Sequence, residues 1–101
     1  MQYLVTAHDG KDMLEKRLAV RGRHLDNIGR IISHVVCAGG ILDDAGRMAG
    51  SVLVLDFDTR EELDGYLKSE PYILEGVWQD VRVEPMNAVI VDGKMAGRKN
   101  G

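Results

Sequence analysis

Apolar residues recur at helical spacing between Met13 and Ile32, and this repeat limits the possible folds more than any other feature of the chain. The repeat consists of Leu14, Leu18, Leu25, Ile28 and Ile32. Such spacings place side chains along one face of an α-helix. We therefore predict one long helix over residues 13–32 with this face against the core, although Gly22 and Gly29 each weaken it by about 1 kcal/mol relative to Ala.

Four short apolar runs predict strands around this helix. They span residues 2–7, 34–38, 51–57 and 81–84. Gly39 and Gly40 are expected to break the second run, and Pro85 is expected to end the fourth. A small additional hairpin is predicted where residues 88–91 precede an Asp-Gly pair.

Capping residues set the limits of the predicted helices. Asp12 is expected to cap the first helix. Thr59 and Glu62 have the spacing of a capping box and open a second helix after the third strand. Glu70 ends this helix, because the residue before a proline avoids the α region. The proline itself, Pro71, can start a short helical turn.

The order of these elements is β-α-β-β-α-β, the split motif of ferredoxin-like α+β folds. Both helices then cover one face of an antiparallel sheet whose first and third strands are central. Both central strands carry apolar residues on their two faces: Tyr3 and Val5 opposite Leu4, and Val52 and Val54 opposite Leu53 and Leu55. Since a solvated face would alternate apolar with polar residues, we expect the uncovered face to be buried in a homodimer or a larger assembly. The alternative is that the extra hairpin folds over it.

Length, charge and hydropathy limit the class of protein. The 101 residues suit one compact domain of residues 1–86, followed by a C-terminal hairpin or tail of residues 87–101. A net charge of −3 and a pI of about 5.5 argue against a nucleic-acid partner. The longest apolar stretch, residues 35–42, is far shorter than the ~20 residues of a membrane span. Because the N-terminus also lacks the features of a signal peptide, we expect a cytoplasmic protein without membrane contact.

The sequence contains no motif for a metal or a nucleotide cofactor. Its single cysteine, Cys37, excludes an internal disulfide and a zinc site built from several cysteines. Its three histidines, His8, His24 and His34, do not have the spacing of metal ligands, and no Gly-rich phosphate loop follows the first strand. We therefore expect a protein that works without metal or cofactor.

Arg17, Arg21, His24 and Ile28 form a stripe along one edge of the apolar face of the first helix. Histidine changes its charge near neutral pH, so His24 is a candidate acid or base, or else a boundary residue with a structural hydrogen bond. Arg17 and Arg21 could bind an anionic substrate or extend into solvent. Because the pattern places His24 beside the core, we expect His24→Ala to cost about 1 kcal/mol or less.

Candidate residues also lie in the loops. Asp9 follows the first strand, where a side chain can reach a cleft or form a turn. Glu70 lies in the break between two helical turns, which could aim its carboxylate inward or leave it in solvent. Ser51 lacks the spacing of a nucleophile with its base, and we consider it with Tyr72 as a substrate-binding residue; both could instead be structural.

Several motifs in chain order resemble those of one family. The run from Leu14 to Arg21 followed by His24-Leu25 is similar to the first helix of YciI-like proteins, which carry the YCII-related domain. Further matches are Asp9, Ala38-Gly39-Gly40 in place of Ala-Gly-Pro, residues 46–51, Glu70-Pro71-Tyr72 with Glu in place of Asp, Gly76-Val77, and residues 81–85. The resemblance covers about residues 2–86.

This resemblance implies both a fold and a site. The fold is a ferredoxin-like domain that dimerises sheet to sheet as a dimeric α+β barrel. The site lies near His24 and the carboxylate of the Asp-Pro motif, which is Glu70 in this chain and is longer by one methylene group. Some members are associated with the degradation of aromatic compounds, including elimination of HCl from chlorinated hydroxyquinols.

Two functions are compatible with these residues. The first is a cofactor-free enzyme that carries out an isomerisation or elimination on a small hydroxylated aromatic or lactone-type molecule. His24 is then the base, Glu70 or Asp9 orients it or returns the proton, and Arg17 or Arg21 binds an anionic group. The second is a non-catalytic dimer that binds a small molecule. A His24–carboxylate pair within hydrogen-bond distance would favour the enzyme, and a dry pocket with His24 turned away would favour the binder.

Overall fold

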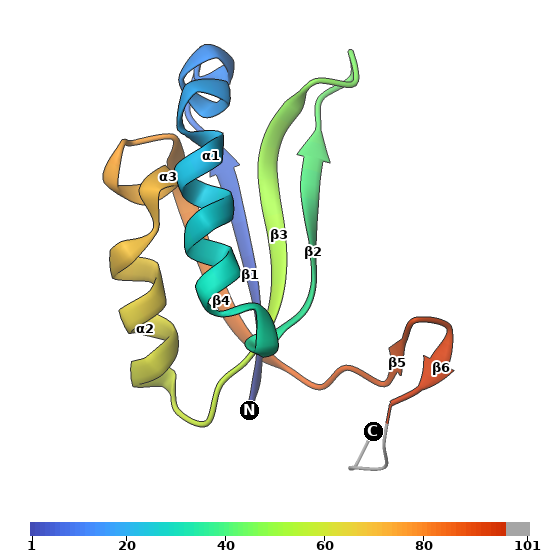
Figure 1. The fold of residues 1–101 in the computed structure, drawn as a ribbon. Helices are drawn as coiled ribbons and strands as arrows, with labels where there is room; N and C mark the ends of the chain where they lie inside the picture. Colours follow the sequence, from blue (N-terminus) through green and yellow to red (C-terminus); the bar gives the residue numbers. More distant parts are fainter. Residues whose placement is uncertain (97–101) are drawn as a thin grey trace.

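The computed structural model describes residues 1–96, which form a four-stranded sheet, three α-helices and a small hairpin (Figure 1). The strands of the sheet are β1 (Gln2–Asp9), β2 (Val35–Leu42), β3 (Met48–Asp56) and β4 (Trp78–Met86). The helices are α1 (Leu14–Arg30), α2 (Arg60–Ser69) and α3 (Pro71–Leu74), with a 3₁₀ turn at Ile32–His34. The hairpin consists of β5 (Ile90–Val91) and β6 (Lys94–Met95).

The sheet has the topology expected of a ferredoxin-like fold. Its strand order is β2-β3-β1-β4, and every neighbouring pair is antiparallel. The first and third strands are therefore central, and both long helices lie on the same face of the sheet (Figure 1). The predicted α+β fold class is confirmed.

All four strands are longer than predicted, and two of them continue through residues that were expected to break or end them. Gly39 and Gly40 do not break β2, because they pair with Val52 and Ser51 of β3. Gly40 lies against Met48, and a Cβ atom at this position would collide with the Met48 side chain. Likewise Pro85 does not end β4, since an edge strand tolerates a residue without a backbone N–H.

The helix boundaries follow local signals in α2 and α3 but not at the start of α1. Thr59 and Glu62 form the predicted capping box of α2. Pro71 is at the first position of α3. The side chain of Glu70, the residue before it, accepts a hydrogen bond from the backbone N–H of Tyr72. Asp12 does not cap α1; it adopts a left-handed turn conformation with φ of 56°, and Met13 precedes the first helical residue.

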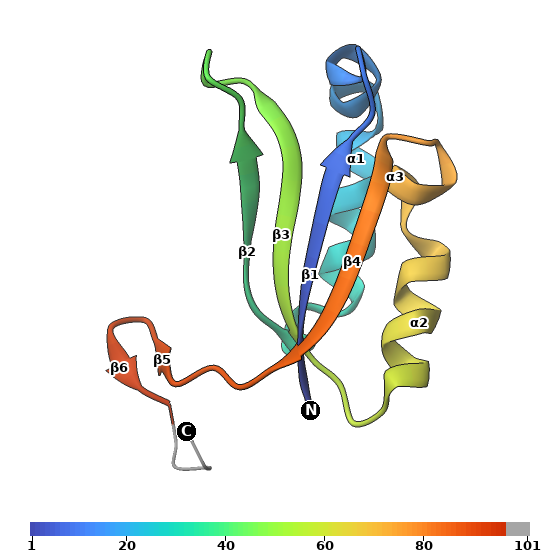
Figure 2. The same ribbon diagram turned by 180° about the vertical axis from the view of Figure 1, so that it is seen from behind.

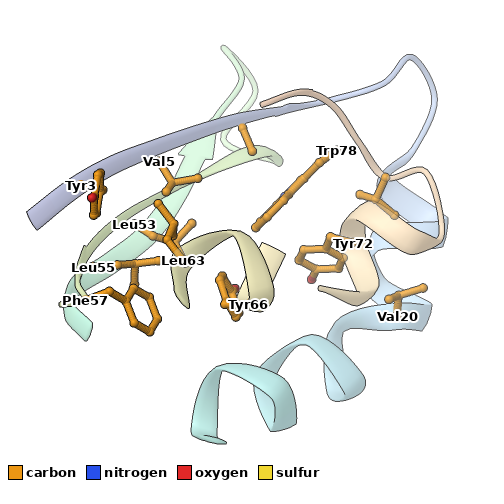
Figure 3. Close-up of a cluster of buried hydrophobic side chains, with 12 residues drawn as sticks. Tyr3, Val5, Val20, Leu53, Leu55, Phe57, Leu63, Tyr66, Tyr72 and Trp78 are labelled. Atoms are coloured by element: carbon orange, nitrogen blue, oxygen red, sulfur yellow. The ribbon is translucent and has the colours of Figure 1, made fainter. Parts of the chain in front are cut away.

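The core lies between the sheet and the helices (Figure 3). It is built by one face of the central strands together with aromatic side chains from α2, α3 and the start of β4. Its buried apolar residues are Tyr3, Val5, Ala7, Val20, Leu53, Leu55, Phe57, Leu63, Tyr66, Tyr72, Val77 and Trp78.

The prediction of which face of α1 meets the core is wrong. Leu18, Leu25 and Ile32 of the apolar repeat are 59%, 45% and 64% exposed. The buried residues of the helix are Arg17, Val20, His24 and Asn27. Helical periodicity weighs only apolar side chains, whereas three of these four residues are polar and have hydrogen-bond partners that lie far away in the sequence, such as Ser51 for Arg17.

The face of the sheet opposite the helices is open in the single chain (Figure 2). Leu4, Thr6 and Val52 on this face are only partly buried. The β5–β6 hairpin lies beside the sheet and does not cover its centre (Figure 2). The predicted tail at residues 97–101 lies outside the described residues.

Residues 1–96 contain no helix that is long and apolar enough to cross a membrane. The cytoplasmic location stays a prediction, and so does the boundary between a domain of residues 1–86 and a separate C-terminal part.

The orientation of α1 can be tested by paired substitutions. Val20 is 2% exposed, so Val20→Ala should lower the free energy of unfolding by about 1–2 kcal/mol. Leu18→Ala removes more apolar atoms but from an exposed site, and should cost less than about 0.5 kcal/mol. Urea denaturation measures both values. A larger loss for Leu18→Ala than for Val20→Ala would contradict the observed orientation.

Candidate active site

A cleft opens between α1 and the β2–β3 pair. Its volume is about 290 Å³. The lining residues are Arg17, Arg21, His24, Leu25, Ile28, Ala38, Gly39, Gly40, Met48, Ser51, Leu53 and Tyr72. Small residues of β2 form one wall, and the polar edge of α1 forms the other. Five of the seven residues proposed from the sequence for the site therefore line one cleft: Arg17, Arg21, His24, Ser51 and Tyr72.

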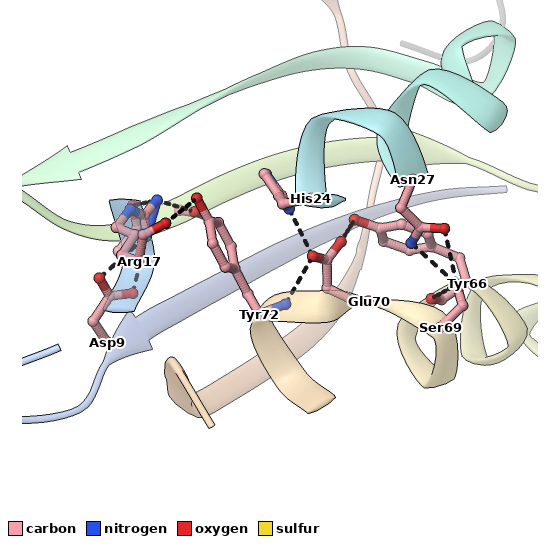
Figure 4. Close-up of polar contacts among 10 residues, drawn as sticks. Asp9, Arg17, His24, Asn27, Tyr66, Ser69, Glu70 and Tyr72 are labelled. Carbon is pink, nitrogen blue, oxygen red and sulfur yellow. Dashed lines mark hydrogen bonds and ion pairs between the residues drawn. The ribbon is translucent and has the colours of Figure 1, made fainter. Parts of the chain in front are cut away.

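A buried hydrogen-bonded pair, His24 and Glu70, lies behind this cleft (Figure 4). Nδ1 of His24 and Oε1 of Glu70 are 2.6 Å apart. Glu70 is completely buried and also accepts hydrogen bonds from the backbone N–H of Tyr72 at 3.1 Å and from the hydroxyl of Tyr66 at 2.5 Å. The break before Pro71 therefore aims the carboxylate of Glu70 inward. The extra methylene group of Glu does not prevent the contact with His24.

The surroundings of His24 determine which ring nitrogen is available. An ionised carboxylate only accepts hydrogen bonds, so we place the ring proton on Nδ1, where it is donated to Glu70. Nε2 is then the nitrogen left for the cleft. The ring stacks on Tyr72 with centroids 4.1 Å apart and meets the edge of Trp78 at 5.8 Å. These contacts fix the orientation of the ring beside the cleft.

His24 is not a boundary residue. It is 8% exposed and packed between aromatic rings. Loss of the imidazole would leave the buried carboxylate of Glu70 without one of its three partners. The prediction that His24→Ala costs about 1 kcal/mol or less assumed that His24 lies at the edge of the core. Because His24 is buried and contacts the buried carboxylate of Glu70, this prediction loses its basis.

A second polar cluster closes one end of the cleft. Nη1 of Arg17 donates to both carboxylate oxygens of Asp9, at 3.0 and 3.1 Å. Nη2 donates to the carbonyl oxygen of Gly50 at 2.9 Å and to Oγ of Ser51 at 2.7 Å. The guanidinium also lies 4.7 Å from the centroid of the Tyr72 ring. Asp9 thus pairs with Arg17, and the structure does not bring it to His24.

The two candidate arginines differ in their surroundings. Arg17 is 3% exposed and its guanidinium is occupied by Asp9 and Ser51. Arg21 is exposed, lines the cleft, and has no hydrogen bond or ion pair within residues 1–96. Arg21 is therefore the arginine available to bind an anionic ligand.

Tyr72 contributes an uncharged hydroxyl to the cleft. Burial raises the pKa of Tyr72, while the positive charges of Arg17 and Arg21 act in the opposite direction. The hydroxyl is 3.4 Å from the backbone oxygen of Arg17, to which it donates. Tyr72 thus supports the site through its ring under His24 and through its contact with α1.

The sequence did not point to Tyr66, Asn27 or Ser69. Burial, and secondly the charge of Glu70, raise the pKa of Tyr66, so its hydroxyl stays protonated and can only donate to the carboxylate. Nδ2 of Asn27 donates to Oγ of Ser69 at 3.1 Å and so joins α1 to the end of α2. A signal for Tyr66 did exist, because residues four apart on a helix are neighbours and Tyr66 lies four positions before Glu70.

The other histidines lie outside the cleft. His34 stacks on Phe57, and its Nδ1 lies 2.8 Å from the backbone oxygen of Asp56. His8 is exposed at the end of β1. Within residues 1–96, no three His, Cys, Asp or Glu side chains lie close enough together to hold a metal ion.

The comparison with known sequences gives one family. A model of the YCII-related domain matches residues 1–87. The protein YciI of Escherichia coli O6:H1 is 31% identical over 97 residues, which cover 88% of this chain and 99% of that protein. An uncharacterized protein of Haemophilus influenzae is 33% identical over 98 residues, with 88% and 99% covered. Aspercryptin biosynthesis cluster protein B of Emericella nidulans is 33% identical over 95 residues, with 83% and 61% covered.

The comparison with solved structures supports the same fold. The chain superposes on a 5-chloro-2-hydroxyhydroquinone dehydrochlorinase from Burkholderia phenoliruptrix with a TM-score of 0.80. The alignment covers 86% of this chain and 94% of that one, at 21% sequence identity. That structure is a complex with 2,5-dihydroxybenzoquinone. At this identity the likeness shows the fold.

The different surroundings of the two arginines predict different effects on stability. Arg17→Met would leave the buried carboxylate of Asp9 without its cation and should cost about 3–5 kcal/mol. Arg21→Met should change the free energy of unfolding by less than about 0.5 kcal/mol, because the side chain is exposed and unpaired. Urea denaturation of both variants gives the comparison. Equal losses would contradict the assignment of Arg17 to the framework of the site.

Proposed function

The chain belongs to the YCII-related domain family, and on this premise we propose that it is a small enzyme that catalyses proton transfer without a cofactor. The reaction is an isomerisation or an elimination, including loss of HCl. The substrate is a small hydroxylated aromatic or lactone-type metabolite. One observation carries the proposal: the 2.6 Å contact between Nδ1 of His24 and Oε1 of Glu70 directly behind the cleft.

The residues of the cleft suggest how the protons move. Nε2 of His24 takes a proton from a hydroxyl group or a carbon atom of the substrate, and Glu70 stabilises the imidazolium that forms. Arg21 binds the oxygen that becomes negative. In an isomerisation His24 returns the proton to another carbon atom. In an elimination of HCl from a chlorinated ring, His24 first returns the proton to the carbon that bears chlorine, which gives a ketone tautomer. Chloride then leaves with the electron pair of the C–Cl bond while His24 takes the proton of a second hydroxyl group and releases it to solvent.

The size of the cleft supports a substrate with one ring. A volume of about 290 Å³ is at the lower end of the range for small-molecule sites. The dehydrochlorinase with the same fold binds a dihydroxybenzoquinone, which is a single ring with several oxygen atoms. Arg21 at the cleft suits an ionised hydroxyl group of such a ring.

The enzyme is favoured over a non-catalytic binding protein. His24 lines the cleft, and its Nδ1 contacts the fully buried carboxylate of Glu70. Binding alone does not require a buried charge, which is costly to desolvate. A base with a fixed tautomer does require such a partner.

We also propose that two copies associate through the open face of the sheet. Leu4 and Val52 supply partly exposed apolar surface there, and no helix covers it (Figure 2). A stable interface buries about 1,600 Å² in total.

The dimer can be tested at Val52, which faces away from the helices. Val52→Glu should split the dimer and leave the monomer folded, whereas the isosteric Val52→Thr should preserve a larger share of dimer. Light scattering at micromolar concentration reports the mass, and circular dichroism reports folding. If the unmodified chain is a monomer under these conditions, the proposed interface is wrong; a larger mass would indicate a higher oligomer.

The proposed chemistry can be tested with a chlorinated hydroxyquinol and with lactone substrates. His24→Ala should lower kcat by about 10²-fold or more, while His8→Ala should leave it unchanged. Glu70→Gln removes the charge that favours imidazolium, so the acidic limb of the pH–rate profile should move to lower pH. Because every proton passes through His24, activity should persist in EDTA. Full activity of folded His24→Ala, or loss of activity with EDTA that one metal restores, would contradict the proposal.

A further inference from the structure

The two oxygens of the Glu70 carboxylate have different partners. Oε1 lies next to Nδ1 of His24 and accepts the backbone N–H of Tyr72. Oε2 accepts the hydroxyl of Tyr66 at 2.5 Å, and within residues 1–96 it has no other hydrogen-bond donor. Since Glu70 is completely buried, water does not replace this donor. The charge of Glu70 is therefore shared between a histidine and a tyrosine on opposite sides.

We propose that Tyr66 is a positioning residue that fixes the carboxylate of Glu70 and limits the negative charge that this carboxylate presents to His24. Tyr66 does not touch the cleft, and no comparison or sequence motif points to it. This inference rests on the proposed function, because it assigns Tyr66 the task of keeping His24 neutral, and thus able to accept a proton, at lower pH.

The geometry of α2 explains how Tyr66 reaches the carboxylate. Tyr66 and Glu70 are four residues apart, so their side chains lie on the same face at the end of the helix. The carboxylate then extends from this end toward His24 on α1. One carboxylate thus contacts both side chains, with Oε1 next to His24 and Oε2 next to Tyr66.

No charged or polar group on the elements around His24 and Glu70 is free to replace the hydroxyl of Tyr66 within residues 1–96. From α1, Arg17 is bound to Asp9 at the end of β1, and Arg21 faces the cleft. From α3, Tyr72 offers its backbone N–H to Oε1 and directs its hydroxyl to the backbone of α1. Without the hydroxyl of Tyr66, the carboxylate would hold its full charge toward His24, so the pair would bind its proton more tightly.

The test uses Tyr66→Phe with Tyr3→Phe as the matched control, because Tyr3 is also buried but lies away from Tyr66 and Tyr72 (Figure 3). NMR of the substrate-free protein follows the His24 ring resonances as a function of pH. In Tyr66→Phe the midpoint should rise by about one pH unit, and in Tyr3→Phe it should not move. The acidic limb of the pH–rate profile of Tyr66→Phe should also move to higher pH, while KM changes little. This shift is opposite in direction to the one expected for Glu70→Gln.

An unchanged midpoint in folded Tyr66→Phe would overturn the inference. If this variant does not fold, the unmodified protein still decides the question. The Tyr66 hydroxyl proton should give a downfield resonance that shifts with the same midpoint as His24, and a resonance insensitive to that titration would overturn the inference. Because these measurements need no turnover, they are independent of the activity of His24→Ala, which tests the proposed function itself.

Discussion

The buried charge of Glu70 determines how the three helices are arranged around the site. A carboxylate without water needs several donors, and each helix supplies one: α1 the imidazole of His24, α2 the hydroxyl of Tyr66, and α3 the N–H of Tyr72. The polar side of α1 therefore faces the core, while its row of leucines remains exposed. The same contacts that neutralise the charge also orient His24 toward the cleft.

Local signals in the sequence were sufficient to predict much of the fold. The capping box at Thr59 and the break at Pro71 depend on residues within a few positions, and both occur as expected. The orientation of α1 could not be predicted, because His24 and Glu70 are separated by 46 positions. The continuation of β2 through Gly39 was also missed, since it depends on pairing with β3. Pattern analysis describes local preference, and these features depend on distant partners.

The candidate site was predicted in its composition but not in its roles. The sequence marked Arg17 and Arg21 as equivalent, yet one is bound to Asp9 and the other is free at the cleft. Asp9 was proposed for catalysis, but its two oxygens are used by Arg17. Burial separates these residues into a framework that closes the cleft and a small set that can meet a ligand.

We infer that Glu70 holds the proton of His24 on Nδ1 and leaves Nε2 free for the cleft. A two-dimensional ¹H–¹⁵N NMR spectrum of the histidine rings, recorded at a pH where His24 is neutral, distinguishes the two tautomers directly. We expect His24 to be protonated at Nδ1, with a downfield proton that disappears in Glu70→Gln. A neutral ring protonated at Nε2 would contradict this account, since the nitrogen facing the cleft could then accept no proton.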